Sequence, residues 1–198
     1  KVYGSWSKWT INKSSSGTTI AASGGSGTVS APTAIRTRSY TWNGTGTSYT
    51  EQGTGTPTLT KQSGDGSFSV SGTTATVSYG NNTTISSKST VVRATMDTEY
   101  VDTTFTQSAG SKVYGSWSKW SVYCNASSFT VSASGGSVTI YSGASRSRSW
   151  TWNGVSGSGG TESESATPTL SASGSGSLSG TTLSYGNNTS TSSRTTRV

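Results

Sequence analysis

Two stretches of the sequence bring arginine and aromatic side chains together at a spacing that suits a binding face. Successive side chains of a β-strand point to opposite faces, so every second residue shares a face. On this pattern one face carries Arg36, Arg38, Tyr40 and Trp42 in the first stretch, and Arg146, Arg148, Trp150 and Trp152 in the second.

These side chains support two interpretations. As a ligand or partner contact, aromatic faces stack on sugar rings or on side chains of another protein, and guanidinium groups bind carboxylate or carbonyl oxygens. As structure, Trp42 and Trp152 are core tryptophans of a central sandwich strand. The arginine stems then cover apolar surface at the solvent end of that strand. We favour the core interpretation for the tryptophans and weigh both interpretations equally for the arginines.

A second aromatic pair, Trp6 and Trp9, recurs as Trp117 and Trp120. Residues three apart on a regular strand face opposite sides unless a bulge intervenes. We therefore expect one tryptophan of each pair inside the core and the other outside it. Packing is the expected role, because the segments that hold the pairs are identical.

Catalytic and metal-binding residues are scarce. The chain has no histidine, which removes the usual general base and the commonest metal ligand. None of its seven carboxylates is expected to keep its place between the two halves. Cys124 has no counterpart in the first half and no histidine to activate it. The sequence therefore predicts no catalytic residue, no metal site, no cofactor and no enzymatic activity.

The strongest organising signal is an internal repeat. Residues 1–9 recur identically as residues 112–120, and residues 78–83 recur as residues 184–189. A repeat of about 110 residues is the size of a whole β-sandwich domain. We predict two tandem modules, residues 1–111 and 112–198, of which the second has no counterpart of residues 93–110.

Alternating apolar residues and turn signals predict short strands throughout, and no helical periodicity is present. The clearest strand ends the first copy, where Val101, Thr103, Phe105 and Gln107 share a face. Other alternating sets are Phe68 with Val70, Ala75 with Val77 and Tyr79, and Val92 with Ala94 and Met96. The predicted fold is all-β, two tandem immunoglobulin-like β-sandwiches, the second lacking its last strands and so exposing an edge and an open core.

The amino-acid composition limits the kinds of partner that the chain is expected to bind. The net charge of +7 reflects few acids, and the 14 Lys and Arg form no run, which disfavours nucleic acid. No apolar run is long enough to predict membrane insertion. The single cysteine cannot form an intrachain disulfide. Because the sequence opens inside a patterned segment, we expect it to be a piece of a longer chain.

The order of a Ser-Gly-Gly strand, a tryptophan strand, a Tyr-Gly-Asn-Asn turn, an arginine strand and a closing Thr-Phe-Thr-Gln-Ser-Ala-Gly segment resembles BACON-type bacterial immunoglobulin-like modules. The matching positions of the first copy are residues 23–26, Asn81, Asn82, Arg93 and Gln107. The resemblance implies a spacer, display or adhesion role, with glycan binding in some members. Modules of this type occur in surface proteins of gut bacteria and in structural proteins of their phages.

The expected function is that of a structural or display module at a bacteriophage virion surface, in a capsid decoration, head fibre or tail-associated protein. Its expected partners are other structural subunits of an oligomeric assembly and host surface glycans. The alternative is a bacterial cell-surface adhesin or carbohydrate-binding spacer, with an extracellular location.

Overall fold

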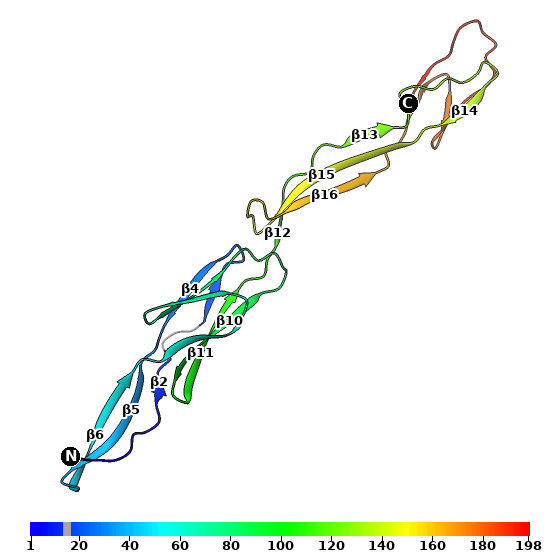
Figure 1. The fold of residues 1–198 in the computed structure, drawn as a ribbon. Helices are drawn as coiled ribbons and strands as arrows, with labels where there is room; N and C mark the ends of the chain where they lie inside the picture. The colour runs from blue at the N-terminus through cyan, green and yellow to red at the C-terminus, as the bar shows by residue number, and fades with distance from the viewer. Residues whose placement is uncertain (14–16) are drawn as a thin grey trace. The chain divides into compact units, whose positions relative to one another are not determined.

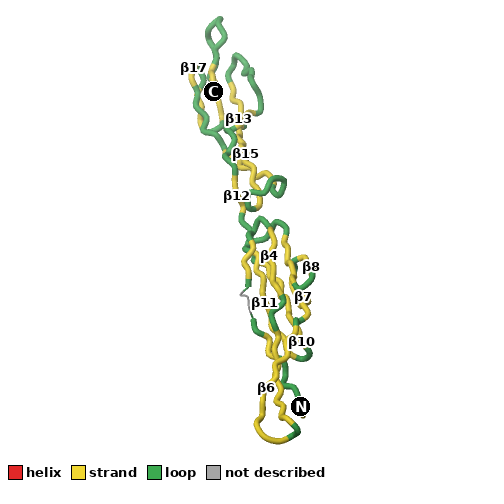
Figure 2. Tube along the Cα trace, turned by 90° about the vertical axis from the view of Figure 1, so that its left-hand side faces the viewer, coloured by secondary structure: helices red, strands yellow, loops and turns green. Residues whose placement is uncertain are grey.

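The computed structural model describes residues 1–13 and 17–198, and every regular element in these ranges is a β-strand (Figure 1; Figure 2). The predicted all-β class is confirmed. No helix in the described part of the chain could cross a bilayer. The chain forms two compact units. Unit 1 consists of Lys1–Val113 with Thr151–Gly159, and unit 2 of Tyr114–Trp150 with Gly160–Val198.

Two sheets of unit 1 enclose its apolar core. One sheet has the order β3–β11–β10–β7, in which β3 and β11 are parallel, and the other has the order β4–β9–β8. The strands of the first sheet are β3 (Thr18–Ile20), β11 (Glu99–Gln107), β10 (Lys88–Met96) and β7 (Thr58–Gly64). Those of the second are β4 (Gly25–Ser30), β9 (Thr74–Tyr79) and β8 (Ser67–Ser71).

The core residues come from both sheets, as expected for a sandwich. The buried cluster is formed by Ile20, Val29, Leu59, Ala75, Val77, Tyr79, Val92, Ala94 and Phe105. The predicted alternation of β11 is confirmed, because Thr103, Phe105 and Gln107 are all buried. Val70 is exposed, whereas Phe68 packs against the core. Both residues belong to β8, which is an edge strand of its sheet.

A polar cluster closes one end of this core. Gln107 is 1% exposed, and its Nε2 donates to the carbonyl oxygen of Gly80 at 2.6 Å and to that of Ala22 at 3.2 Å. The Nδ2 of buried Asn82 donates to the carbonyl oxygen of Ser108 at 2.9 Å. These bonds satisfy loop carbonyls that the sheets leave unpaired. Arg93 lies apart from this cluster and pairs with an acid on β11.

The third sheet of unit 1 carries the arginine stretch on its central strand. Its order is β1–β5–β2, and β6 pairs with β5. The strands are β1 (Val2–Tyr3), β5 (Ala34–Trp42), β2 (Thr10–Ile11) and β6 (Thr45–Gly55). Asn43 and Gly44 join β5 to β6 with φ angles of 55° and 77°. Positive φ at both positions is what a two-residue hairpin turn of type I′ requires.

The strands from Lys112 onward form three smaller sheets, with the orders β12–β15–β13 (β16 pairing with β15), β14–β19–β18 and β17–β20. They are β12 (Lys112–Tyr114), β13 (Ser121–Cys124), β14 (Gly136–Thr139), β15 (Ser142–Trp152), β16 (Gly160–Ala166), β17 (Ser173–Gly174), β18 (Ser177–Ser179), β19 (Thr182–Tyr185) and β20 (Thr196–Arg197). The buried apolar residues of unit 2 are Ile140, Ala144 and Leu183. Unit 2 therefore has a smaller core than unit 1, and Phe129 and Val198 stay exposed.

Candidate functional site

Arg36 and Arg38 of β5 each lie between two aromatic rings. The guanidinium carbon of Arg36 is 4.7 Å from the ring centroid of Trp6 and 4.4 Å from that of Trp9. That of Arg38 is 3.7 Å from Tyr3 and 4.3 Å from Trp6. The five side chains therefore alternate in the order Trp9, Arg36, Trp6, Arg38, Tyr3, and we call this set the arginine–aromatic ladder of unit 1.

The ladder depends on an unequal register between β5 and the segment that precedes β2. The amide of Gly4 donates to the carbonyl oxygen of Ser39 at 2.9 Å, and that of Ser7 donates to Thr37 at 2.7 Å. Three residues of the segment thus run along two residues of β5. Two strand residues span about 6.6 Å, roughly twice the contact distance of stacked carbon atoms. One guanidinium plane consequently fits between consecutive rings.

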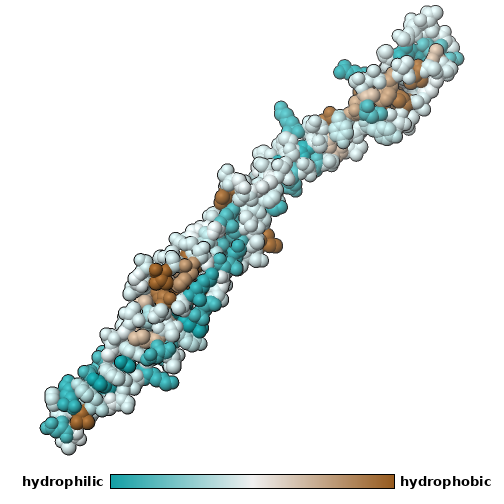
Figure 3. All heavy atoms as spheres, viewed as in Figure 1, coloured by the Kyte–Doolittle hydropathy of each residue, from teal (hydrophilic) through white to brown (hydrophobic). Residues whose placement is uncertain are grey.

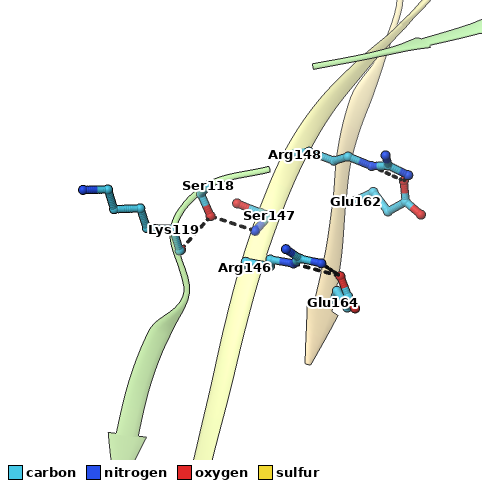
Figure 4. A network of polar contacts seen from close by, with 7 residues as sticks. All are labelled: Ser118, Lys119, Arg146, Ser147, Arg148, Glu162 and Glu164. Carbon is cyan, nitrogen blue, oxygen red and sulfur yellow. Dashed lines mark hydrogen bonds and ion pairs between the residues drawn. The ribbon is translucent and has the colours of Figure 1, made fainter. Parts of the chain in front are cut away.

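The serine between the two tryptophans fixes this register. Ser7 Oγ accepts a hydrogen bond from the amide of Thr37 at 2.9 Å and donates to the carbonyl oxygen of the next residue at 2.9 Å. In the second copy, Ser118 Oγ accepts from the amide of Ser147 at 3.0 Å and donates to the next carbonyl oxygen at 3.1 Å (Figure 4). Each serine therefore holds its segment midway between the two arginines.

The second copy contains an equivalent ladder within unit 2. Arg146 lies 4.8 Å from the centroid of Trp117 and 4.5 Å from that of Trp120. Arg148 lies 3.9 Å from Tyr114 and 4.5 Å from Trp117. The prediction that Trp6 and Trp9, or Trp117 and Trp120, face opposite sides is wrong. The residues between β1 and β2, and between β12 and β13, are not in strands, so a spacing of three places both rings over one face.

Three of the four ladder arginines form ion pairs with carboxylates on the neighbouring strand. Arg38 Nε donates to Glu51 Oε2 at 2.6 Å. In unit 2, Arg148 pairs with Glu162 and Arg146 with Glu164, at Nη2–Oε2 distances of 3.0 and 2.8 Å (Figure 4).

Glu51 and Glu162 occupy the same place in the two copies, opposite the second arginine of each stretch. The expectation that no acid keeps its place is therefore wrong. Arginine and glutamate are 13 residues apart in one copy and 14 in the other, which hides the match in the sequence.

Arg36 is the exception. The residue opposite it on β6 is Gly53, so no carboxylate faces it there. Its Nε is buried and has no hydrogen-bond partner in the described structure. A Cβ atom at Gly53 would lie 3.3 Å from the ring of Trp6, which is a tight contact. The Arg36 charge is thus held mainly by the two indole faces.

The remaining residues of the predicted face lie at the turn end of β5. Tyr40 stacks on Tyr49 with centroids 5.4 Å apart and meets Trp42 edge-on at 6.3 Å. Lys1 Nζ lies 4.1 Å from the Tyr40 centroid. Trp42 is 55% exposed, so its interpretation as a core residue is wrong. The buried cluster is built between the other two sheets, and the turn end of β5 lies outside it.

The corresponding residues of the second copy are also outside the apolar core. Trp150 and Trp152 are half-buried, and neither belongs to the buried apolar residues of the described structure. The core interpretation of Trp152 is therefore wrong as well. All four predicted arginines therefore contact aromatic rings. Trp42 and Trp152, in contrast, are the last residues of β5 and β15 and lie at the turns that follow these strands.

Arg93 of β10, outside both ladders, also has an aromatic and an acidic partner, and both of these lie on β11. Arg93 donates from Nε and Nη2 to the two carboxylate oxygens of Asp102, both at 2.8 Å, and lies 3.7 Å from the Tyr100 centroid. These hydrogen bonds, helped by the positive charge of Arg93, hold the pKa of Asp102 below its usual value. The same bonds raise the pKa of Arg93.

The described residues include no group of three or more histidine, cysteine, aspartate or glutamate side chains that could hold a metal ion. Figure 3 shows a mostly pale or teal surface, on which hydrophobic residues form small separate groups. Comparison with family models, with curated proteins and with solved structures finds no match for the chain. What the chain does must therefore be inferred from the ladders themselves.

Proposed function

We propose that this chain is a non-enzymatic structural and display module of a bacteriophage virion, part of a capsid decoration, head fibre or tail-associated protein. The observation that carries the proposal is the ladder, which occurs twice with the same geometry. Each guanidinium lies over two aromatic rings, and three of the four have a carboxylate partner. Side chains that make this many contacts within one unit stabilise that unit.

The ladder contributes the largest share of the free energy of unfolding in a module whose apolar core is small. A cation–π contact contributes about 0.5–1 kcal/mol when exposed and about 2 kcal/mol when desolvated. Each ladder contains four such contacts, in which the arginines are half-buried. They attach the irregular segment before β2, or before β13, to the adjacent sheet where no disulfide is available. A rigid module of this kind suits a particle surface, and the resemblance to BACON-type modules supports the same role.

Cryo-electron microscopy of the native assembly that carries this chain tests the proposal. Density for the modules on a capsid or tail is the expected result. Density on a bacterial envelope would overturn the virion assignment and support the alternative, a cell-surface adhesin or spacer.

A carbohydrate-binding role is a second candidate, favoured by the exposed aromatic group at the turn end of β5. Trp42, Tyr49 and Tyr3 are each more than two-fifths exposed, and Lys1 Nζ lies 5.7 Å from the Trp42 ring centroid. Such rings stack on sugars. A glycan array probed with the wild-type chain and with Trp42→Ala tests this role. Binding that Trp42→Ala abolishes supports it, whereas no binding by the wild-type chain rejects it.

A further inference from the structure

Arg36 is the ladder arginine whose charge no acid of the described structure balances. No carboxylate of the described residues lies within ion-pair distance of its guanidinium group. Its Nε is the one side-chain nitrogen or oxygen of these residues that is both buried and without a hydrogen-bond partner. The two terminal nitrogens also lack hydrogen bonds there, so they are exposed to solvent. Arg36 therefore presents an unpaired positive charge at the surface.

The rings on either side hold this charge in a fixed position. The guanidinium carbon lies 4.7 Å from the Trp6 centroid and 4.4 Å from the Trp9 centroid. Trp9 is itself fixed, because its Nε1 donates to Asp97 Oδ2 at 2.8 Å. A binding group that is already held in place loses little conformational freedom when a ligand binds. Arg36 is thus preorganised for an anion.

The second copy shows which anion fits this position of the ladder. Arg146 occupies the same ladder position as Arg36 and donates from Nε to Glu164 Oε2 at 2.9 Å. The Nη2–Oε2 distance of the same pair is 2.8 Å (Figure 4). Glu164 stands opposite Arg146 on β16, and Gly53 stands opposite Arg36 on β6. The same ladder position therefore binds a carboxylate in one copy and lacks it in the other.

The backbone of β6 limits how a ligand reaches Arg36. A Cβ atom at Gly53 would lie 3.3 Å from the Trp6 ring, and one at Gly55 would lie 3.1 Å from the Trp9 ring. The two rings therefore lie close against the glycines, with little room for a ligand between them and β6. A carboxylate reaches Arg36 from the solvent side, where it accepts hydrogen bonds from the terminal nitrogens.

The acids of the chain itself are almost all engaged. Six of the seven carboxylates have a partner within the chain, namely Glu51, Asp97, Glu99, Asp102, Glu162 and Glu164. The net charge of +7 further disfavours a second copy as the source of a carboxylate, because like-charged chains repel each other. We therefore expect the carboxylate to come from a different, acidic molecule.

We propose that Arg36 is a binding site for an acidic polysaccharide, in which a uronate group takes the place on Arg36 that Glu164 takes on Arg146. A polysaccharide is favoured over an acidic protein because hydrophobic residues form only small separate groups on the face that Figure 3 shows, whereas a stable protein interface has an apolar centre. The class of ligand rests on the carbohydrate-binding candidate above. The site does not, because Trp42 lies at the other end of β5.

Isothermal titration calorimetry of the full chain with trigalacturonate at low salt tests the site. We expect the wild-type chain to bind it and Gly53→Glu to bind it about tenfold more weakly, which is the effect of losing one hydrogen-bonded charge pair. In this variant the new glutamate occupies Arg36 as Glu164 occupies Arg146. Thr54→Glu adds the same charge at the next residue, whose side chain points to the opposite face of β6, and is expected to bind like the wild-type chain. No binding by the wild-type chain, or equal binding by Gly53→Glu, would overturn the proposal.

The opposite substitution, Glu164→Gly, gives the second copy the arrangement of the first. It removes the carboxylate from Arg146 and leaves that guanidinium over its two rings. The number of trigalacturonate sites per chain should rise from one to two. Glu164→Ala, which keeps a side chain in the strand, should give the same increase. A single site in both variants would show that a ladder arginine without a carboxylate partner does not bind uronate, and would overturn the proposal.

Three comparisons separate this site from the other candidates. The methyl ester of trigalacturonate lacks the charge, and equal binding of the ester and the acid would overturn the role of the carboxylate. Tighter binding of an oligoglutamate peptide than of trigalacturonate would overturn the assignment to a sugar. Binding that Trp42→Ala abolishes and Gly53→Glu leaves intact would place the sugar at the turn end of β5. The carbohydrate-binding candidate would then stand without the Arg36 site.

Discussion

Arg36 and Gly53 lie opposite each other on β5 and β6, whereas the equivalent Arg146 faces Glu164 and bonds to it. The first ladder therefore lacks one carboxylate that the second ladder has. Gly53→Glu should supply it. We expect the free energy of unfolding of unit 1 to rise by about 0.5–1 kcal/mol, from the new ion pair and the loss of a glycine in a strand. Chemical denaturation at low salt measures this change.

The matched control for that substitution is Gly53→Gln, which has the same shape without the charge. Gly53→Gln should keep the gain in unfolding free energy that comes from replacing a glycine in a strand. It should lack the gain that comes from the ion pair. Raising the salt concentration should bring the two variants together, because salt screens a half-exposed ion pair. A Gly53→Glu variant less stable than Gly53→Gln at low salt would show that the tight contact with Trp6 outweighs the ion pair.

Trp6 and Trp42 should respond very differently to substitution by alanine. Trp6 stacks on both Arg36 and Arg38, so Trp6→Ala should lower the free energy of unfolding by about 1–3 kcal/mol. Trp42 is mostly exposed, and Trp42→Ala should change stability by less than about 0.5 kcal/mol. Thermal denaturation of both variants measures the difference. Equal losses would contradict the assignment of the ladder as the stabilising element.

Local patterns in the sequence are sufficient to predict strands such as β11 and the hairpin turn between β5 and β6. The alternation of Thr103, Phe105 and Gln107 has the period of a strand with one buried face, and these residues are buried as predicted. The Asn43-Gly44 pair specifies a turn that few other residues could form, because both positions need positive φ. Both features depend on a few neighbouring residues, which is why the sequence alone reveals them.

The ladder could not be predicted in the same way, because it depends on two segments that are distant in the sequence. The three-residue spacing of Trp6 and Trp9 becomes meaningful only against the two-residue spacing of Arg36 and Arg38 across the sheet. The exposure of Trp42 follows from where the other sheets lie, and no local pattern encodes that.

Gly27 and Phe105 form a packing pair that distinguishes the two copies. A Cβ atom at Gly27 would lie 2.9 Å from the Phe105 ring. Gly27 pairs with Val77 on β9, and at the corresponding place in unit 2 Val138 pairs with Leu183. We expect Gly27→Val to lower the free energy of unfolding by about 1–3 kcal/mol through overpacking.

A double substitution tests whether that loss arises from the Phe105 ring. Phe105→Ala alone should cost about 3–5 kcal/mol, because the side chain is fully buried. Combined with Gly27→Val, it should cost less than the sum of the two single losses, since the added valine occupies part of the space that the ring leaves. Additive losses would mean that Gly27→Val acts through the strand backbone and not through the ring.

The Arg93–Asp102 ion pair should make the stability of unit 1 depend on pH in the acidic range. The pKa of Asp102 is lowered in the folded state, mainly by the hydrogen bonds from Arg93. A carboxyl group of this kind contributes stability that is fully present above its unfolded pKa of about 4. The contribution is lost as the pH falls through the lower, folded pKa. Asp102→Asn should therefore be less stable than the wild-type chain at pH 7 and converge with it between about pH 4 and pH 2. Chemical denaturation of both proteins across this range measures the convergence. A difference in the free energy of unfolding that stays constant down to pH 2 would contradict this prediction. It would show that the hydrogen-bond geometry, and not the charge of Asp102, stabilises the β10–β11 pair.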